Sequence, residues 1–236
     1  LNVKEIFGEV AVPLLRDQSF FQDLTVNGAV RLTDYSVSGS VTTWKVGATW
    51  RMSDDFMLRG VYSRDIRAPS LFELFAGDSS TISIVNDPVT NSSANVPQLR
   101  GGNPFLTPEV AKTLSFGTVL TPRFAPGLSL SVDYYRIRLN KAINGLVAQA
   151  IVTNCFQFGP SSPECSLITR PTPTSFPTLI RLAESNISFI NTSGVDFDAS
   201  YRTKLGEGAL AFRLYASYLG SFKTQAFGGQ PVIDWT

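Results

Sequence analysis

Alternating apolar and polar residues over residues 40–63 constrain the fold of this chain more than any other feature. From residue 44 to residue 50 every second side chain is apolar, and the side chains between them are polar or small. The pattern resumes after the polar turn at residues 53–55, so the segment reads as an antiparallel hairpin. An aromatic residue lies at each end of the apolar stripe on both strands. These residues are Trp44, Trp50, Phe56 and Tyr62.

The spacing of these rings points to a bilayer. A soluble sheet gives no reason for aromatic rings at both edges of an apolar stripe, whereas a lipid-facing sheet places them at the two headgroup levels. The six residues from Trp44 to Trp50 cover about 20 Å of strand, close to the height of the lipid-facing band of a transmembrane barrel. We therefore predict a transmembrane β-hairpin.

The composition excludes several classes of function. The 236 residues contain no histidine, which excludes Ser–His triads, histidine acid/base catalysis and histidine-ligated metals. A net charge of +1 with 17% charged residues gives no support for nucleic-acid binding. No run approaches 18 apolar residues, so we expect no transmembrane helix. We expect no enzyme, no metal and no cofactor.

Period-2 alternation recurs and predicts eight strands. They cover about residues 3–14, 24–34, the two arms of 40–63, 110–121, a strand from 128, 186–203 and 209–219. In the sixth strand the apolar phase shifts after Tyr135 to Ile137 and Leu139, which predicts a bulge or an exit from the bilayer. The N-terminus already reads as strand without a signal peptide. We therefore expect a mature protein or an internal fragment, and favour the fragment.

The connections between the strands differ in length. The short ones cover residues 15–23, 53–55, 122–127 and 204–208, whereas the two at 64–109 and 140–185 exceed 40 residues. Only the short connection at 35–39 breaks the alternation of short and long. Short periplasmic turns and long extracellular loops are typical of outer-membrane barrels. An antiparallel up-and-down transmembrane β-barrel is therefore favoured over a soluble β-sandwich.

The same asymmetry orients the hairpin and its rings. Because the turn at 53–55 is short, we place it in the periplasm. Trp50 and Phe56 then mark the inner headgroup level, and Trp44 and Tyr62 mark the outer one.

Two cysteines lie in the second long connection. Nine residues, including turn-forming Gly159, Pro160 and Pro163, separate Cys155 from Cys165. We expect a disulfide formed outside the cytoplasm, contributing about 2–3 kcal/mol by loop closure. The alternative is a pair of unrelated thiols.

Four motifs carry a resemblance to a known family. They are Arg67-Ala68-Pro69 with Glu73-Leu74-Phe75, Asn103-Pro104 with Leu106, Pro108 and Glu109, Asp133-Tyr134-Tyr135, and the run from Asn191 to Asp196. In this order and spacing, over most of residues 40–203, the chain resembles the C-terminal half of the barrel of TonB-dependent receptors. These are active transporters of the Gram-negative outer membrane.

The resemblance implies a 22-stranded barrel around an N-terminal plug domain. It implies uptake of a scarce nutrient, such as a ferric siderophore, cobalamin or a saccharide, energised through the TonB–ExbB–ExbD complex. The plug and the TonB contact segment are not in this chain, which supplies about eight strands within residues 1–236. A passive porin or adhesin barrel is the alternative. An outer-membrane enzyme such as a phospholipase is weaker, because its usual nucleophile activation needs histidine.

Two sets of residues are candidates for contact with ligand or plug. Polar residues in the inward phase of the strands are expected to face the lumen: Lys45, Arg51, Arg59, Asp133, Asp196, Asp198, Arg202 and Arg213. Loop residues are expected to contact ligand: Arg67, Phe105, Phe156, Phe158 and Phe176. Each set has a structural alternative, since any water-filled barrel needs polar inward residues that pair across strands. The loop phenylalanines could equally pack their own loops.

Overall fold

The computed structural model describes residues 2–225 and 231–236 and divides the chain into two compact units. The sheet unit comprises Leu1–Arg67, Pro108–Ala142 and Ser188–Thr236. The loop unit comprises Ala68–Thr107 and Ile143–Ile187. Across the described residues, no helix is both long and apolar enough to span a membrane.

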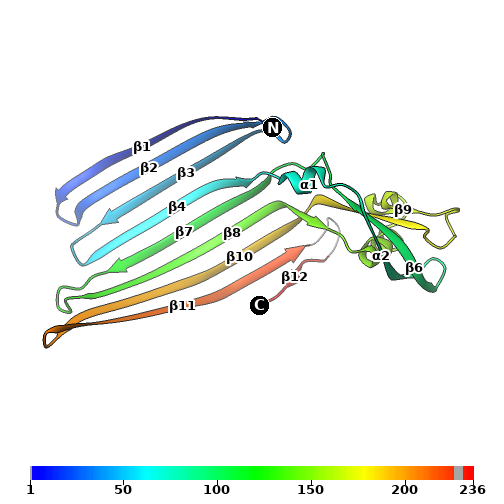
Figure 1. Cartoon of the computed structure of the whole chain (residues 1–236). Coiled ribbons are helices and arrows are strands. Elements are labelled where there is room, and N and C mark those ends of the chain that lie inside the picture. The colour runs from blue at the N-terminus through cyan, green and yellow to red at the C-terminus, as the bar shows by residue number, and fades with distance from the viewer. Residues whose placement is uncertain (1, 226–230) are drawn as a thin grey trace. The chain divides into compact units, whose positions relative to one another are not determined.

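The sheet unit is built from long strands that follow one another in chain order (Figure 1). They are β1 (Val3–Gln18), β2 (Phe21–Tyr35), β3 (Gly39–Arg51), β4 (Phe56–Arg67), β7 (Glu109–Leu120), β8 (Leu128–Gly145), β10 (Leu179–Leu205) and β11 (Gly208–Gln225), followed by the short β12 (Ile233–Asp234). The eight predicted strands correspond to the eight long strands. Within the described residues β1 pairs with β2 alone, so the sheet is open.

The strand registers give the sheet two distinct faces. Side chains directly opposite each other in antiparallel strands share a face, and Trp44, Arg64, Lys112 and Arg138 form one such row across β3, β4, β7 and β8. We call the face that carries this row, together with Tyr62, Phe116 and Tyr134, the apolar face. The polar face carries the alternate residues, among them Lys45, Arg59 and Asp133.

The apolar face has no covering layer among the described residues. Phe116 on this face is 55% exposed and Val46 is 47% exposed. Of the buried apolar side chains in the described part of the chain, all except Ala142 belong to the loop unit. A sheet with so much uncovered apolar surface is stable only against another apolar phase, as expected of a lipid-facing sheet.

Of the two alternatives predicted beyond Tyr135, the bulge is contradicted by the pairing of β7 with β8, and the exit from the bilayer stays a prediction. The register between β7 and β8 runs without a shift from Val110 opposite Asn140 to Leu120 opposite Leu130. Ile137 and Leu139 therefore stay on the polar face, and the intervening Arg136 and Arg138 stay on the apolar face. Beyond Tyr135 the apolar and charged residues exchange faces, while the backbone of β8 keeps its alternation.

The register shifts lie elsewhere. One falls between Pro13 and Leu15 in the pairing of β1 with β2, and another falls between Ser193 and Gly194 in the pairing of β10 with β11. Pro13 borders the first of these shifts, and an irregularity in the ladder is one of the places where a strand tolerates proline, which has no backbone N–H to donate.

The two long connections fold into the loop unit, which has regular elements that their polar composition did not predict. These are α1 (Leu71–Phe75), the hairpin β5 (Ser79–Asp87) and β6 (Ser92–Gly101), α2 (Ala148–Phe158), the 3₁₀ helix η1 (Pro163–Leu167) and β9 (Ile168–Thr169). β6 pairs in parallel with the start of β10, and β9 pairs with it antiparallel. Val85, Val96, Ile151, Val152 and Ile180 form the fully buried core.

Local signals explain these elements. Ser70 and Glu73 form a capping box at the start of α1, in which each side chain accepts a hydrogen bond from the other residue's backbone N–H. The turn between β5 and β6 contains Pro88 and places Asn91 at φ 50°, a left-handed conformation that asparagine tolerates. Helix α2 begins at Ala148, within the second long connection, and ends at Phe158, directly before Gly159 at φ 84°.

The cysteine pair joins two elements of the loop unit. Cys155 in α2 and Cys165 in η1 form a disulfide, with 4.8 Å between their Cα atoms. The bond closes the turn that contains Gly159 and Pro160, so it fixes α2 against η1.

A buried ion pair joins the β5–β6 hairpin to the second long connection, at the residue that follows β9. Nη1 and Nη2 of Arg170 each donate to an oxygen of the Asp87 carboxylate at 2.7 Å, and Nη1 also donates to the Ser175 carbonyl at 2.6 Å. Burial raises the pKa of Asp87, but hydrogen bonds from Arg170 and Thr90 and the Arg170 charge outweigh it. The pKa of Asp87 therefore lies below its ordinary value.

Replacing Asp87→Asn should loosen the loop unit, because it leaves the Arg170 charge buried without a counter-charge. We expect a loss of roughly 3–5 kcal/mol in local stability, measured by limited proteolysis of the full-length receptor. Asp78→Asn is the control, since its 3.7 Å pair with Arg181 is half exposed and should contribute little.

The wild-type loop unit should also be acid-sensitive. A carboxylate with a depressed folded pKa contributes stability above its unfolded pKa of about 3.9 and loses it as the pH falls further. Cleavage by an acid-active protease should therefore rise below about pH 4, and Asp87→Asn should flatten this rise. Equal cleavage of Asp87→Asn and Asp78→Asn at neutral pH would contradict the assignment.

Candidate functional site

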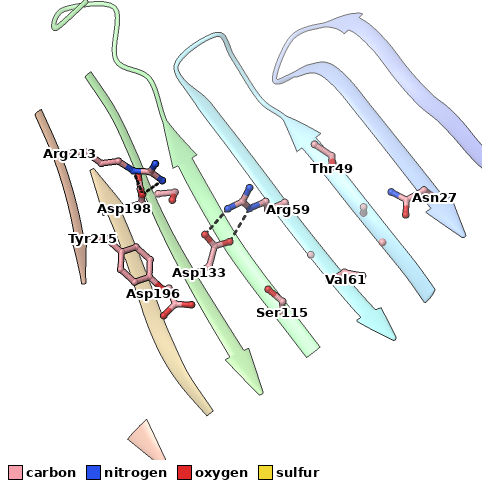
Figure 2. Close-up of a pocket in the computed structure, with 14 residues that line it drawn as sticks. Asn27, Thr49, Arg59, Val61, Ser115, Asp133, Asp196, Asp198, Arg213 and Tyr215 are labelled. Carbon is pink, nitrogen blue, oxygen red and sulfur yellow. Dashed lines mark hydrogen bonds and ion pairs between the residues drawn. The ribbon is translucent and has the colours of Figure 1, made fainter. Parts of the chain in front are cut away.

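A polar hollow on the polar face of the sheet unit brings together most of the predicted lumen-facing residues. It has a volume of about 710 Å³. Five of the predicted residues line it: Arg59, Asp133, Asp196, Asp198 and Arg213. Figure 2 shows these side chains on the same side of neighbouring strands. Asn27, Thr49, Ser115, Ser131 and Tyr215 also line the hollow.

Arg59 and Asp133 pair across a strand that lies between them. Arg59 Nε donates to Asp133 Oδ1 at 2.9 Å, and Nη2 donates to Oδ2 at 2.7 Å. The residue between them in the same cross-strand row is Gly117 on β7. A Cβ at Gly117 would overlap the Asp133 carboxylate and lie 2.8 Å from the Val132 carbonyl. The bidentate pair therefore requires glycine at this position.

Asp196 and Asp198 of β10 form hydrogen bonds with side chains of β11. Arg213 donates to Asp198 Oδ2 from Nε at 3.0 Å and from Nη2 at 2.7 Å (Figure 2). The Ser217 hydroxyl donates to Asp196 at 2.6 Å. Tyr215 lies opposite Asp198 in the same hollow. The candidate list omitted Tyr215, although it has the same strand phase as Arg213.

A second polar hollow, of about 310 Å³, lies on the polar face near β1. Lys45 Nζ lies 3.0 Å from Glu9 Oε1. Arg31 lies 3.8 Å from Glu5 and stacks on the Phe7 ring at 5.5 Å from its centroid. The acidic residues of β1 thus lie close to basic residues of β2 and β3.

Arg51 and Arg202 line neither of these hollows. Arg51 lies opposite Asp23 and Met57, and Arg202 lies opposite Ala211. Both are exposed on the strand ends nearest the short connections. The structure therefore brings six of the eight predicted lumen-facing residues into polar hollows and leaves these two at the margin.

Arg67 stands at the junction of β4 with the first long connection. Its Nε and Nη2 donate to the two oxygens of Glu109 at 2.7 and 2.8 Å, and the Glu109 side chain is only 8% exposed. The two residues face each other at the ends of β4 and β7. The ion pair joins the last paired residues of β4 and β7, which suits a structural role for Arg67.

The loop unit presents exposed aromatic side chains. Phe105 is 88% exposed, and two residues that the candidate list omitted, Phe72 and Phe75, are 77% and 54% exposed. All three belong to one small region, because Asn103 and Gly102 donate backbone hydrogen bonds to the carbonyls of Glu73 and Ala76. We call Phe72, Phe75 and Phe105 the aromatic patch. The capping box of α1 was the sequence signal that could have placed Phe72 and Phe75.

The remaining loop candidates differ in exposure. Phe156 lines an apolar hollow of about 470 Å³ beside the disulfide, together with Val89, Ile168 and Pro171. Phe158 is exposed, whereas Phe176 is half-buried. Among the described residues, no cluster of three His, Cys, Asp or Glu side chains could hold a metal ion.

The predicted interface rings make contacts on the apolar face. Trp44 packs edge-to-face on Tyr62 with 5.3 Å between ring centroids. At the other strand end Trp50 stacks on Phe21 at 5.0 Å and donates its indole N–H to the Phe20 carbonyl at 2.9 Å. Both clusters are apolar ring pairs, and in the second the Trp50 indole also has a polar contact, which suits a headgroup level.

Comparison with known proteins identifies the fold. A family model described as TonB dependent receptor-like, beta-barrel, matches residues 6–234. The solved structure of the siderophore receptor PirA from Acinetobacter baumannii is similar, with 15% identity and a TM-score of 0.65 over 94% of this chain and 30% of that one. The ferric enterobactin receptor PfeA from Pseudomonas aeruginosa has 13% identity and a TM-score of 0.64 over 94% and 29%. The chain therefore spans about a third of the length of these structures.

Gly117→Ala should destabilise the sheet unit, because the added methyl group collides with Asp133 and separates it from Arg59. We expect a cost of about 1–3 kcal/mol from overpacking, seen as a lower thermal midpoint of the full-length receptor in detergent. Gly8→Ala on β1 is the matched control, since a Cβ there meets no atom within 4 Å. Equal midpoints for the two variants would refute the requirement for glycine at position 117.

Proposed function

Because the chain belongs to the TonB-dependent receptor β-barrel family, we propose that it forms part of the barrel wall and the outer loops of a receptor for a scarce nutrient. Proteins of this family lie in the outer membrane of Gram-negative bacteria and are receptors and transporters rather than enzymes. The nutrient would enter past the polar face, driven by the TonB–ExbB–ExbD complex. That complex would act through an N-terminal plug region that does not belong to this 236-residue chain.

One observation carries this proposal. The strands of the sheet unit form an uncovered apolar face and, on the other side, a polar face whose charged residues pair with one another. The Arg59–Asp133, Arg213–Asp198 and Lys45–Glu9 pairs line the polar face. A wall of paired charges is hydrophilic but has little net charge, so a hydrated solute can pass without being trapped by a single strong ion pair. Plug residues could form hydrogen bonds with the same side chains.

A ferric siderophore is the ligand class that we favour. The similar solved structures are named as siderophore and ferric enterobactin receptors. The exposed aromatic patch offers flat apolar surfaces, which suit the rings of an organic iron chelator. Cobalamin and saccharides are the competing ligand classes.

Uptake by cells that lack the receptor and carry the full-length gene on a plasmid tests the proposal. We expect accumulation of radioactive iron when it is supplied with a siderophore, and loss of accumulation when the proton gradient is collapsed. Cobalamin and a labelled oligosaccharide complete the ligand panel. Uptake that persists without the proton gradient would contradict the energised receptor and favour the passive porin.

The aromatic patch is tested in the same cells. Replacing Phe72, Phe75 and Phe105 together with alanine should raise the half-saturating ligand concentration about tenfold or more, as expected when stacked rings are lost from a binding site. Phe124→Ala is the control, because Phe124 is 91% exposed on the short connection between β7 and β8. Equal half-saturation for the two variants would remove the patch from the binding site.

A further inference from the structure

Among the residues that the structure describes, four cations on the apolar face have no acidic partner. Arg64, Lys112 and Arg138 occupy one cross-strand row with Trp44, and Arg136 occupies the next row with Tyr62 and Leu114. We call Arg64, Lys112, Arg136 and Arg138 the cationic cluster. It lies at the end of β4, β7 and β8 that adjoins the long connections, at the level of the outer ring pair.

The four positive charges of this cluster repel one another. Directly opposite side chains in antiparallel strands have Cβ atoms about 5 Å apart, and like charges there destabilise a sheet. Every acidic residue in β3, β4, β7 and β8 lies on the polar face: these are Asp65, Glu109 and Asp133. The β10 segment Ser188–Val195 contains no acidic residue. Nothing in these strands therefore compensates the cationic cluster.

The cluster also has a shape that accepts a ligand. Lys112, Arg136 and Arg138 line a hollow of about 400 Å³ together with Tyr62 and Leu114. Lys112 and Arg138 are exposed, and Arg64 is held in place by a hydrogen bond from Nη1 to the Thr42 carbonyl. Below the hollow, Phe116, Val132 and Tyr134 continue the exposed apolar surface along the same strands.

We infer that this hollow binds the phosphorylated headgroup of an outer-leaflet lipid, whose acyl chains lie along Phe116 and Val132. Arginine matches phosphate oxygens in a bidentate fork, and lysine adds a point charge. A phosphate between the two rows offsets the repulsion among the four cations. The apolar strip continuous with the hollow selects a lipid over a free anion. This inference rests on the membrane placement of the barrel, and it is independent of which nutrient the receptor takes up.

The test uses full-length receptor purified in non-ionic detergent and examined by native mass spectrometry. The probes are a lipid A with two phosphates, the same lipid with both phosphates removed, and inorganic phosphate. We expect the phosphorylated lipid to remain bound to the wild-type receptor. Replacing Lys112, Arg136 and Arg138 together with glutamine should weaken its retention on the order of a hundredfold, since each cation near a membrane surface contributes to attraction of anionic lipid.

The matched control removes the same charge from the other end of the strands, with Arg16, Arg123 and Lys204 replaced by glutamine. This variant should retain the phosphorylated lipid. Equal loss from both variants, equal retention of the dephosphorylated lipid, or complete displacement by inorganic phosphate would each overturn the inference. Nutrient uptake by the Lys112/Arg136/Arg138 variant should persist. Absence of uptake in the wild type would instead overturn the proposed function and leave the lipid result standing.

Discussion

The structure depends on the pairing of backbone groups between long antiparallel strands whose apolar face has no protein cover. Hydrocarbon offers no hydrogen-bond partner to a peptide group, so a spanning segment must pair every N–H and C=O internally. The continuous registers of β2 with β3 and of β4 with β7 meet this requirement over the whole span between the ring clusters. Once the pairing is fixed, strict alternation assigns each side chain to lipid or to the polar hollows. Trp44 and Arg59 lie on opposite faces for this reason alone.

Where alternation governs the chain, the sequence alone was sufficient. It predicted all eight long strands and assigned Arg59, Asp133, Asp198 and Arg213 to one face, because a period of two leaves a side chain only two directions. It could not predict that Arg59 reaches Asp133 over Gly117, since that contact depends on the register of three strands. The false bulge after Tyr135 arose from treating a change of residue type as a change of backbone phase. Arg136 and Arg138 are in fact cations on the apolar face.

The loop unit shows a different limit of sequence reading. Its hairpin and helices come from long polar stretches in which alternation is short, and its core is assembled from separate segments, as Val85, Ile151 and Ile180 show. Such contacts between distant segments leave no local pattern. Asp87 and Arg170 are 83 residues apart, and the residues that flank each of them in the sequence give no signal that the two side chains pair. The capping box of Ser70 and Glu73 is a local signal from which α1 could have been predicted, but it carries no information about the neighbours of α1.

Site-directed cysteine labelling along β7 tests most directly whether the two faces meet lipid and water. Single cysteines at Thr113, Leu114, Ser115 and Phe116 are introduced into the full-length receptor in lipid vesicles, with any free thiol outside this chain replaced by serine. Within this chain Cys155 and Cys165 are bonded to each other. The account predicts that Thr113→Cys and Ser115→Cys react with a water-soluble maleimide. Probes attached at Leu114→Cys and Phe116→Cys should instead be quenched by brominated lipid. Uniform reactivity along the strand, or the reverse alternation, would contradict it.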